Sequence, residues 1–253
     1  MNLSVVIPVY NAADFIEESV RGLAAFLDGK GVEHEIVLSN DGSTDGSLAA
    51  LRRLEGGPVR VVSSEQNRGK FAAIRDGMRA ATGSCKVFTD ADVPFDHSAV
   101  VYIERLVNGR GFHVVIGDRT LPGSAYAESV AWARRLTTSL FRQAVRLLIT
   151  GGVPDSQTGL KGFRADVADA LFPLLTENAF GGDIELLYIA LKYNLEIRRI
   201  PVRLQRQGRS TVRPLRHSWP MLRTLARLRG NWRRGAYRSD ALAAIARQRY
   251  WES

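Results

Sequence analysis

Short apolar runs alternate with amphipathic stretches through the first third of the chain. Four runs rich in β-forming residues begin near positions 3, 35, 59 and 85, and polar or glycine-containing segments end each of them. Apolar side chains recur at helical spacing over residues 15–27, and a second helical pattern covers residues 70–81. Strands and helices that alternate at this spacing predict a parallel sheet with helices on its faces.

The triplet Asp90-Ala91-Asp92 stands directly after the fourth run. In open α/β sheets, ligands bind at the carboxyl ends of the strands. Two carboxylates one residue apart on a turn can hold Mg²⁺ or Mn²⁺, and Mg²⁺ is usually bound by one or two carboxylates plus substrate phosphates. The triplet by itself would also fit a solvated turn. Its position at the end of a strand is what favours a metal site.

Length and composition fit one enzyme domain with an appendage. A chain of 253 residues is within reach of a single α/β domain, and a hydrophobic content of 45% is enough for a core. Neither a glycine-rich dinucleotide fingerprint after the first strand nor an NTPase phosphate loop occurs in the sequence. Cys85 is the only cysteine, which favours a reducing, cytoplasmic location. The lack of a signal peptide and of a long uncharged apolar stretch supports that expectation.

The basic charge is concentrated at the carboxyl end of the chain. Residues 198–253 hold fifteen arginines, one aspartate and one glutamate, a net charge of +13 in a protein whose total is +9. Apolar residues between Trp219 and Leu228 fall near one helical face, with Arg223 and Arg227 on another. A basic amphipathic helix of this kind predicts an element that lies on a membrane surface. An Arg-rich helix packed on the core is the alternative, and no nucleic-acid partner is expected because no such module is recognisable.

Eight short segments occur in an order that matches a known family. They are Val6-Ile7-Pro8-Val9-Tyr10-Asn11, Asn40-Asp41-Gly42-Ser43-Thr44-Asp45-Gly46, Asn67-Arg68-Gly69-Lys70, Asp90-Ala91-Asp92, Gly117-Asp118-Arg119, Asp155-Ser156-Gln157-Thr158-Gly159-Leu160-Lys161-Gly162-Phe163, Asp183-Ile184-Glu185-Leu186-Leu187-Tyr188 and Gly208-Arg209-Ser210. Together they resemble the motifs of the family 2 inverting nucleotide-sugar glycosyltransferases. They are most similar to those of dolichyl- and polyprenyl-phosphate glucosyltransferases, over about residues 3–235.

The resemblance implies a fold and an activity. The fold is the nucleotide-diphospho-sugar transferase (A-type glycosyltransferase) fold, an α/β domain with a mostly parallel, Rossmann-like sheet flanked by helices. We expect a catalytic domain over residues 1–212 and an Arg-rich amphipathic helical tail over residues 213–253. The implied reaction moves a hexose, with glucose or N-acetylhexosamine favoured, from a nucleotide-sugar to a polyprenyl or dolichyl phosphate. The donor is expected to be UDP-linked, the cofactor Mg²⁺ or Mn²⁺, and the location peripheral on the cytoplasmic face of a membrane.

The resemblance also assigns residues to the donor. Asp41 would contact the base or ribose, and Lys70 would lie near the nucleotide. Asp90 and Asp92 would bind the donor's ribose and the metal on its diphosphate. Asp41 could instead be a turn residue, which is a common role of aspartate. The further residues expected to bind substrate are Pro8, Tyr10, Asn11, Arg134, Arg135, Gln157, Arg209 and Ser210.

Four catalytic residues are implied in the second half of the chain. Arg119 would face phosphate groups, Asp155 and Lys161 would line the sugar site, and Asp183 would lie near the reacting centre. Arg119 and Lys161 could instead be solvated surface charges. Asp183 could simply begin a helix, because acids favour the first turn. Asp118 departs from the family pattern, which has a small residue there.

The chemistry expected of the site depends on the acceptor. A phosphate monoester has its second pKa near 6 and is mostly dianionic at pH 7, so it hardly needs a general base. A soluble or polysaccharide hydroxyl, the alternative acceptor, must give its proton to a carboxylate, and Asp183 or Asp155 would be that base. The rival from another class is a non-catalytic protein that binds a nucleotide-sugar or a nucleic acid. The intact pair of Asp90 and Asp92 argues against it.

Overall fold

One mixed β-sheet forms the centre of the protein. The computed structural model describes residues 1–124, 155, 158–179, 181–205 and 218–248, and for residues 218–225 it describes the backbone alone. Within these residues, seven strands form the sheet in the order β3-β2-β1-β4-β6-β5-β7. Their bounds are β1 Leu3–Val9, β2 His34–Asp41, β3 Val59–Ser64, β4 Cys85–Phe88, β5 Val114–Asp118, β6 Lys161–Arg164 and β7 Ile197–Pro201.

Strand direction brings the ends of the strands to one edge of the sheet. The four apolar runs of the first half are β1 to β4, as the sequence predicts, and they pair in parallel. β6 is antiparallel to both of its neighbours, β4 and β5, whereas β7 is parallel to β5. The carboxyl ends of the six codirectional strands and the first residue of β6 therefore lie at the same edge.

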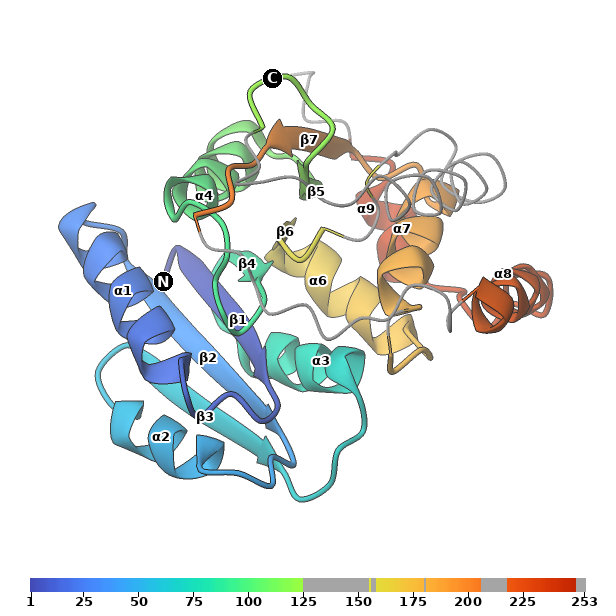
Figure 1. The fold of residues 1–253 in the computed structure, drawn as a ribbon. Helices are drawn as coiled ribbons and strands as arrows, with labels where there is room; N and C mark the ends of the chain where they lie inside the picture. Colours follow the sequence, from blue (N-terminus) through green and yellow to red (C-terminus); the bar gives the residue numbers. More distant parts are fainter. Residues whose placement is uncertain (125–154, 156–157, 180, 206–217, 249–253) are drawn as a thin grey trace.

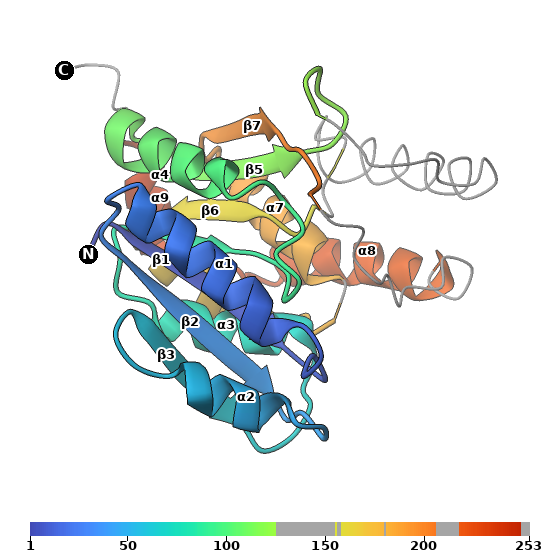
Figure 2. The same cartoon turned by 60° about the vertical axis from the view of Figure 1, so that its left-hand side comes forward.

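Helices cover both faces of the sheet (Figures 1 and 2). The two helices expected over residues 15–27 and 70–81 are α1 and α3. Helix bounds are α1 Ile16–Gly29, α2 Ser47–Leu54, α3 Lys70–Ala80, α4 Ser98–Arg110, α6 Ala165–Leu171, α7 Gly182–Lys192, α8 Ser218–Arg233 and α9 Asp240–Ile245, with a 3₁₀ turn at Phe172–Leu174.

Two apolar clusters hold these layers together. One contains side chains of α1, α2 and α4, such as Leu23 and Ile103, packed against the sheet. The other contains side chains of α3, α6 and α7, and in it Phe163 of β6 packs against Phe88 and Phe172. Burial of each large apolar side chain contributes about 1.5–3 kcal/mol, so both clusters fix the sheet that carries the site.

The carboxyl-terminal part of the chain joins the second cluster. Leu228, Tyr237 and Leu242 are at most 1% exposed and pack with residues of α6 and α7. From Leu228 onward the described residues thus show the alternative in which the Arg-rich segment packs on the core. The domain boundary expected at residue 212 lies outside the described residues and stays a prediction. None of the described helices is long and apolar enough to span a membrane.

Candidate functional site

The carboxyl edge of the sheet collects charged residues from both halves of the chain. Asp90 follows β4 and Arg119 follows β5, while Lys161 is the first residue of β6, the strand between them. Lys161 pairs in register with Phe88 on one side and with Ile116 on the other. Figure 1 shows β6 between β4 and β5. This antiparallel insertion places Lys161 at the same edge as the Asp90 triplet.

Lys70 and Asp90 form an ion pair at this edge. Lys70 begins α3, and its Nζ contacts Asp90 Oδ1. The two side chains are 28% and 35% exposed. Burial lowers the pKa of Lys70, but the negative charges of Asp90, Asp183 and Asp92 outweigh it and raise that pKa above its usual value. Lys70 is thus a positive charge held beside three acids.

Asp41 fixes the loop that carries Lys70. Its carboxylate is buried, and its two oxygens accept the backbone N–H groups of Arg68 and Gly69, each at 2.8 Å. Gly69 has φ of +101°, and a Cβ there would collide with the carbonyl oxygen of Asn178. The observed partners of Asp41 are therefore backbone amides, and its expected contact with the nucleotide stays a prediction.

Lys161 and Asp183 form a buried ion pair. Lys161 Nζ lies 2.5 Å from Asp183 Oδ1 and donates a second hydrogen bond of 2.6 Å to the carbonyl oxygen of Thr158. It also lies 5.4 Å from the ring centroid of Phe88. Lys161 is fully buried and Asp183 is 5% exposed. The alternative of a solvated surface charge is therefore wrong for Lys161, and Asp183 does more than begin α7.

Arg119 and Asp155 form a second, bidentate pair. Arg119 Nε and Nη2 each donate to the Asp155 carboxylate at 2.8 Å, and the Arg119 backbone N–H donates at 2.9 Å. Burial raises the pKa of Asp155, but these bonds, the arginine charge and the Thr158 hydroxyl lower it to about 2. A carboxylate with this pKa and these partners is poorly suited to accept a proton at neutral pH.

Asp92 completes the acidic side of the site. Its pKa is raised by burial and then by the neighbouring charge of Asp90, while Lys70 only partly offsets this. A Cβ on Gly159, two residues before β6, would collide with the Asp90 carboxylate, so a larger residue there would displace that side chain. Two close carboxylates are hard oxygen donors that fit Mg²⁺ or Mn²⁺. Within the described ranges no group of three such ligands occurs, so water and phosphate oxygens would fill the other positions.

The remaining predicted residues divide into two groups. Asn11, with φ of +50°, accepts the N–H of Thr44 at 2.8 Å and so ties the first loop to the second. Pro8 pairs with Ser39 inside the sheet, and Tyr10 is 47% exposed. Outside the described residues lie Arg134, Arg135, Gln157, Arg209 and Ser210.

Two residues, Thr158 and Asp118, make contacts at the site that were not expected from the sequence. Thr158 joins the two buried pairs, because its Oγ1 donates to Asp155 at 2.6 Å and its carbonyl accepts from Lys161. Asp118 is fully buried and accepts a hydrogen bond of 2.6 Å from Arg199 of β7. The departure from a small residue at Asp118 is thus matched by an arginine on the neighbouring strand. Only the position of Thr158 between Asp155 and Lys161 could have signalled its role.

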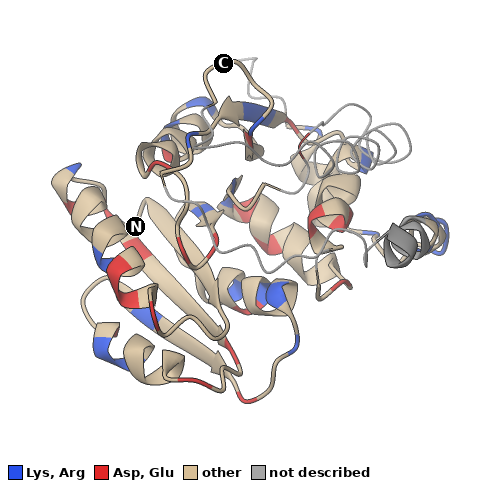
Figure 3. Ribbon diagram, in the orientation of Figure 1, with Lys and Arg blue, Asp and Glu red and all other residues tan. Residues whose placement is uncertain are grey.

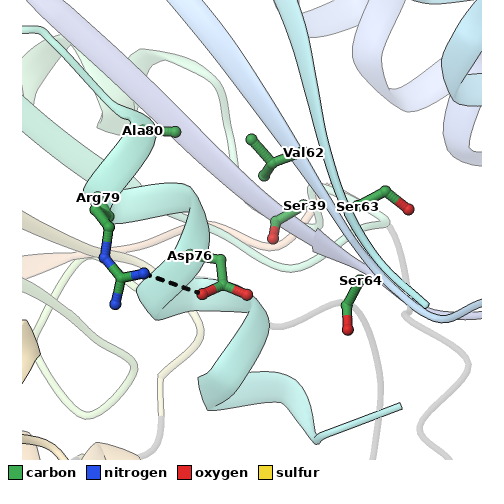
Figure 4. A pocket seen from close by; sticks show the side chains of 7 residues that line it. All are labelled: Ser39, Val62, Ser63, Ser64, Asp76, Arg79 and Ala80. Carbon is green, nitrogen blue, oxygen red and sulfur yellow. Dashed lines mark ion pairs between the residues drawn. The ribbon is translucent and has the colours of Figure 1, made fainter. Parts of the chain in front are cut away.

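A cavity of about 400 Å³ lies beside the edge strand β3 (Figure 4). Asp76 in this cavity forms a 4.0 Å ion pair with Arg79 and also pairs with Arg68. None of the predicted catalytic residues lines it. The lining residues come from α3, β2 and β3 and are Ser39, Val62, Ser63, Ser64, Asp76, Arg79 and Ala80.

Comparison with known proteins agrees with this geometry. The family model described as Glycosyl transferase family 2 matches residues 4–172. Dolichyl-phosphate beta-glucosyltransferase from Dictyostelium discoideum is 26% identical over 249 residues, 93% of this chain and 76% of the relative. The protein of the same name from Drosophila melanogaster is 28% identical over 233 residues, 87% of this chain and 71% of the relative.

A solved structure shows the same fold. It is glucosyl-3-phosphoglycerate synthase from Mycobacterium tuberculosis in complex with Mn²⁺, UDP and glucosyl-3-phosphoglycerate. The TM-score is 0.64 at 23% identity, and the match covers 90% of this chain and 80% of that chain. The expected A-type glycosyltransferase fold and the expected enzyme class are confirmed. The chain belongs to glycosyl transferase family 2 and is a glycosyltransferase.

Proposed function

We propose that this glycosyltransferase moves a hexose, glucose or N-acetylglucosamine, from a UDP-sugar to a polyprenyl phosphate, with inversion at the anomeric carbon. The observation that carries the proposal is the meeting of Asp90, Asp92 and Lys70 with the Lys161–Asp183 pair at one edge of the sheet. This arrangement offers a metal-binding acid pair and fixed positive charges, which a diphosphate leaving group and a phosphate acceptor both need. The names of the dolichyl-phosphate relatives support the acceptor.

Asp90 and Asp92 would hold Mg²⁺ or Mn²⁺. When bound, the metal supplies neutralisation of the charge that develops on the leaving diphosphate. The Mn²⁺ and UDP in the mycobacterial synthase support this assignment. Lys70 remains protonated because its pKa is raised, so its charge stabilises the same leaving group.

The other charged residues would orient the sugar and the acceptor. Lys161 and Asp183 are held in one geometry by burial and by each other, so neither must reorganise during the reaction. Asp155 is tied to Arg119 and ionised down to pH values near 2, so Asp183 is the better base if the acceptor is a hydroxyl. A dianionic phosphate acceptor would not need that base.

A matrix of donors and acceptors tests the proposal. UDP-glucose, UDP-N-acetylglucosamine and GDP-mannose would each be offered with a short-chain polyprenyl phosphate and with the matching polyprenol, in Mn²⁺ and in EDTA. We expect transfer from a UDP-sugar to the phosphate in Mn²⁺, with a rate that falls as pH drops through about 6. Preference for the polyprenol would favour the hydroxyl acceptor, and preference for GDP-mannose would overturn the donor assignment.

We also propose that the protein docks on the cytoplasmic face of an anionic membrane. The arginines at 227, 229, 233, 234 and 238 are exposed on α8 and the segment after it. Figure 3 shows basic positions along α8. Each basic residue near an anionic leaflet contributes about 1 kcal/mol. A polyprenyl phosphate acceptor is met at a bilayer, so this surface would bring the enzyme to its substrate.

Sedimentation with vesicles tests the docking surface. The doubly substituted Arg233→Ser, Arg238→Ser variant should bind anionic vesicles less tightly than the wild type, and added salt should weaken both. Arg105→Ser, Arg110→Ser on α4 is the matched control, because it removes the same charge from another exposed surface. Equal losses of vesicle binding in the two variants would mean that only the net charge matters, which would contradict a docking surface.

A further inference from the structure

The loop that carries Lys70 contacts a second loop, residues 176–178, which lies about one hundred residues later in the sequence. Phe71 N–H donates to the carbonyl oxygen of Asn178 at 2.8 Å, and Gly69 packs against that same carbonyl group. Arg75, one turn along α3, donates to the Glu177 carbonyl oxygen at 3.0 Å and to the Asn178 side chain. Residues on both sides of Lys70 therefore depend on the position of Asn178.

A buried carboxylate sets the position of that second loop. Glu185 of α7 is fully buried, and its Oε2 accepts the N–H groups of Thr176 and Glu177 at 2.9 and 2.8 Å. Its Oε1 accepts the Thr176 hydroxyl at 2.6 Å and the Tyr237 hydroxyl at 2.6 Å. A buried charge needs such bonds to offset the loss of water, so none of these donors is dispensable.

Tyr237 brings the carboxyl-terminal segment into this network. Its hydroxyl donates to Glu185 and accepts from Asn231 Nδ2 at 3.0 Å, and the residue is 1% exposed. Burial and the Glu185 hydrogen bond raise the pKa of Tyr237 to about 12, so the hydroxyl remains a donor throughout the neutral range. The segment continues into α9, which packs against α6.

We infer that Tyr237 and Glu185 are positioning residues of the donor site. Three links connect the carboxyl-terminal segment to the loop of Lys70. The Tyr237 hydroxyl donates to Glu185, the N–H groups of residues 176–177 donate to Glu185, and the Phe71 N–H donates to the Asn178 carbonyl oxygen. Lys70 then meets Asp90 only when this segment is docked. The donor-site role rests on the proposed function, because it takes Lys70 to be the cation that faces the nucleotide diphosphate.

Two tyrosines on this face give a matched pair of variants. Tyr237→Phe removes a hydroxyl with two hydrogen bonds, one of them to Glu185. Tyr193→Phe removes a hydroxyl that also makes two, a bond to the Tyr237 carbonyl oxygen at 2.8 Å and a bond from Ser239 N–H at 2.8 Å. Each variant removes one hydroxyl with two hydrogen bonds from the same segment, but only Tyr237→Phe removes a donor from Glu185.

The two variants would be compared with the wild type by hydrogen exchange at the Phe71 amide and by calorimetry of UDP binding in Mn²⁺. We expect Tyr237→Phe to speed that exchange and to raise the Kd for UDP, each by about tenfold, since a buried acceptor is left short of a donor. It should raise the donor KM more than it lowers kcat. Tyr193→Phe should leave Kd and KM within about twofold of the wild type, because neither of its two bonds involves Glu185 or residues 176–178.

The two readouts separate the inference from the proposed function. Unchanged exchange at Phe71 in Tyr237→Phe would overturn the positioning role. Equal changes in both variants would also overturn it, because they would indicate a general loss of packing. If the wild-type protein binds no UDP in Mn²⁺, the proposed function is wrong, whereas the exchange comparison still decides whether Tyr237 controls the Lys70 loop.

Discussion

Two of the three ion pairs at the edge of the sheet differ sharply in their exposure to solvent. The side chains of Lys70 and Asp90 are about one third exposed, and those of Lys161 and Asp183 are 0% and 7% exposed. Partly exposed charges can exchange partners with a metal or a diphosphate at low cost, because water screens each intermediate arrangement. A buried pair cannot, since a lone charge inside the protein is strongly unfavourable. The comparison separates charges that can exchange partners with a metal or a diphosphate from a pair that keeps a fixed geometry within the site.

The buried pair gives the largest expected effect. Lys161→Met leaves Asp183 without its cation, and we expect the free energy of unfolding to fall by about 3–5 kcal/mol. Urea denaturation of the variant would measure this. The double variant Lys161→Met, Asp183→Leu should recover much of the loss, because it removes both charges. If the single variant is as stable as the wild type, the pair is not held as the contacts indicate.

The exposed side of the site should behave in the opposite way. Asp92→Ala should lower the rate of sugar transfer about a thousandfold while changing stability by less than about 0.5 kcal/mol. A transfer assay in Mn²⁺ and a denaturation curve would be run on one preparation. Asp96→Ala, a nearby loop acid that accepts the Ser98 N–H, is the control for loop damage. Near-wild-type transfer by Asp92→Ala in excess EDTA would argue against a metal site.

The pair of Arg119 and Asp155 should make the stability of the protein depend on pH. Because the pKa of Asp155 is about 2 instead of 3.8, its ionisation stabilises the fold by about 2 kcal/mol above pH 4, and this is lost as pH falls through 2. Asp155→Asn should therefore cost about that much near neutral pH and progressively less in acid. Asp166→Asn is the control, because Asp166 pairs with Arg164 through two similar bonds but is 46% exposed. A cost for Asp155→Asn that does not change between pH 7 and 2 would contradict the assignment.

The smallest effect is expected at the loop before Lys70. In Asp41→Asn, an amide NH₂ faces one of the two backbone N–H groups that the carboxylate accepts. We therefore expect the free energy of unfolding to fall by about 1 kcal/mol and the protein to bind UDP several-fold more weakly. Asp45→Asn is a close match, since Asp45 accepts N–H groups from Ala13 and Ser47 in the adjacent loop. Calorimetry should show weaker binding only for Asp41→Asn. Equal weakening in both variants would mean that the loops act together.

Local sequence patterns were sufficient for the amino-terminal half. The first four strands and the helices α1 and α3 were predicted because apolar runs and helical periodicity are local properties of the chain. The positions of Asp41 and Asp90 at strand ends followed from the same patterns and the parallel topology. Their hydrogen-bond partners did not, since the amides that Asp41 accepts lie in a different loop.

The second half depended more on resemblance and on contacts distant in sequence. The β6 strand has four residues and lies antiparallel between β4 and β5, and no local sequence pattern predicts this arrangement. That insertion decides that Lys161 is buried, because it lies in register between Phe88 and Ile116. Tyr237 likewise offered no local signal, because its partner Glu185 is far away in the sequence.

The sequence by itself thus determined the class of fold, the family and the acids and bases gathered at the strand ends. Tertiary structure decided which of those charges are buried in pairs and which are open to a ligand. It also decided that part of the Arg-rich segment, from Leu228 on, packs on the core. The physical reason is that strand and helix periodicity reflect neighbouring residues, whereas burial and ion pairing depend on segments brought together only when the sheet is complete.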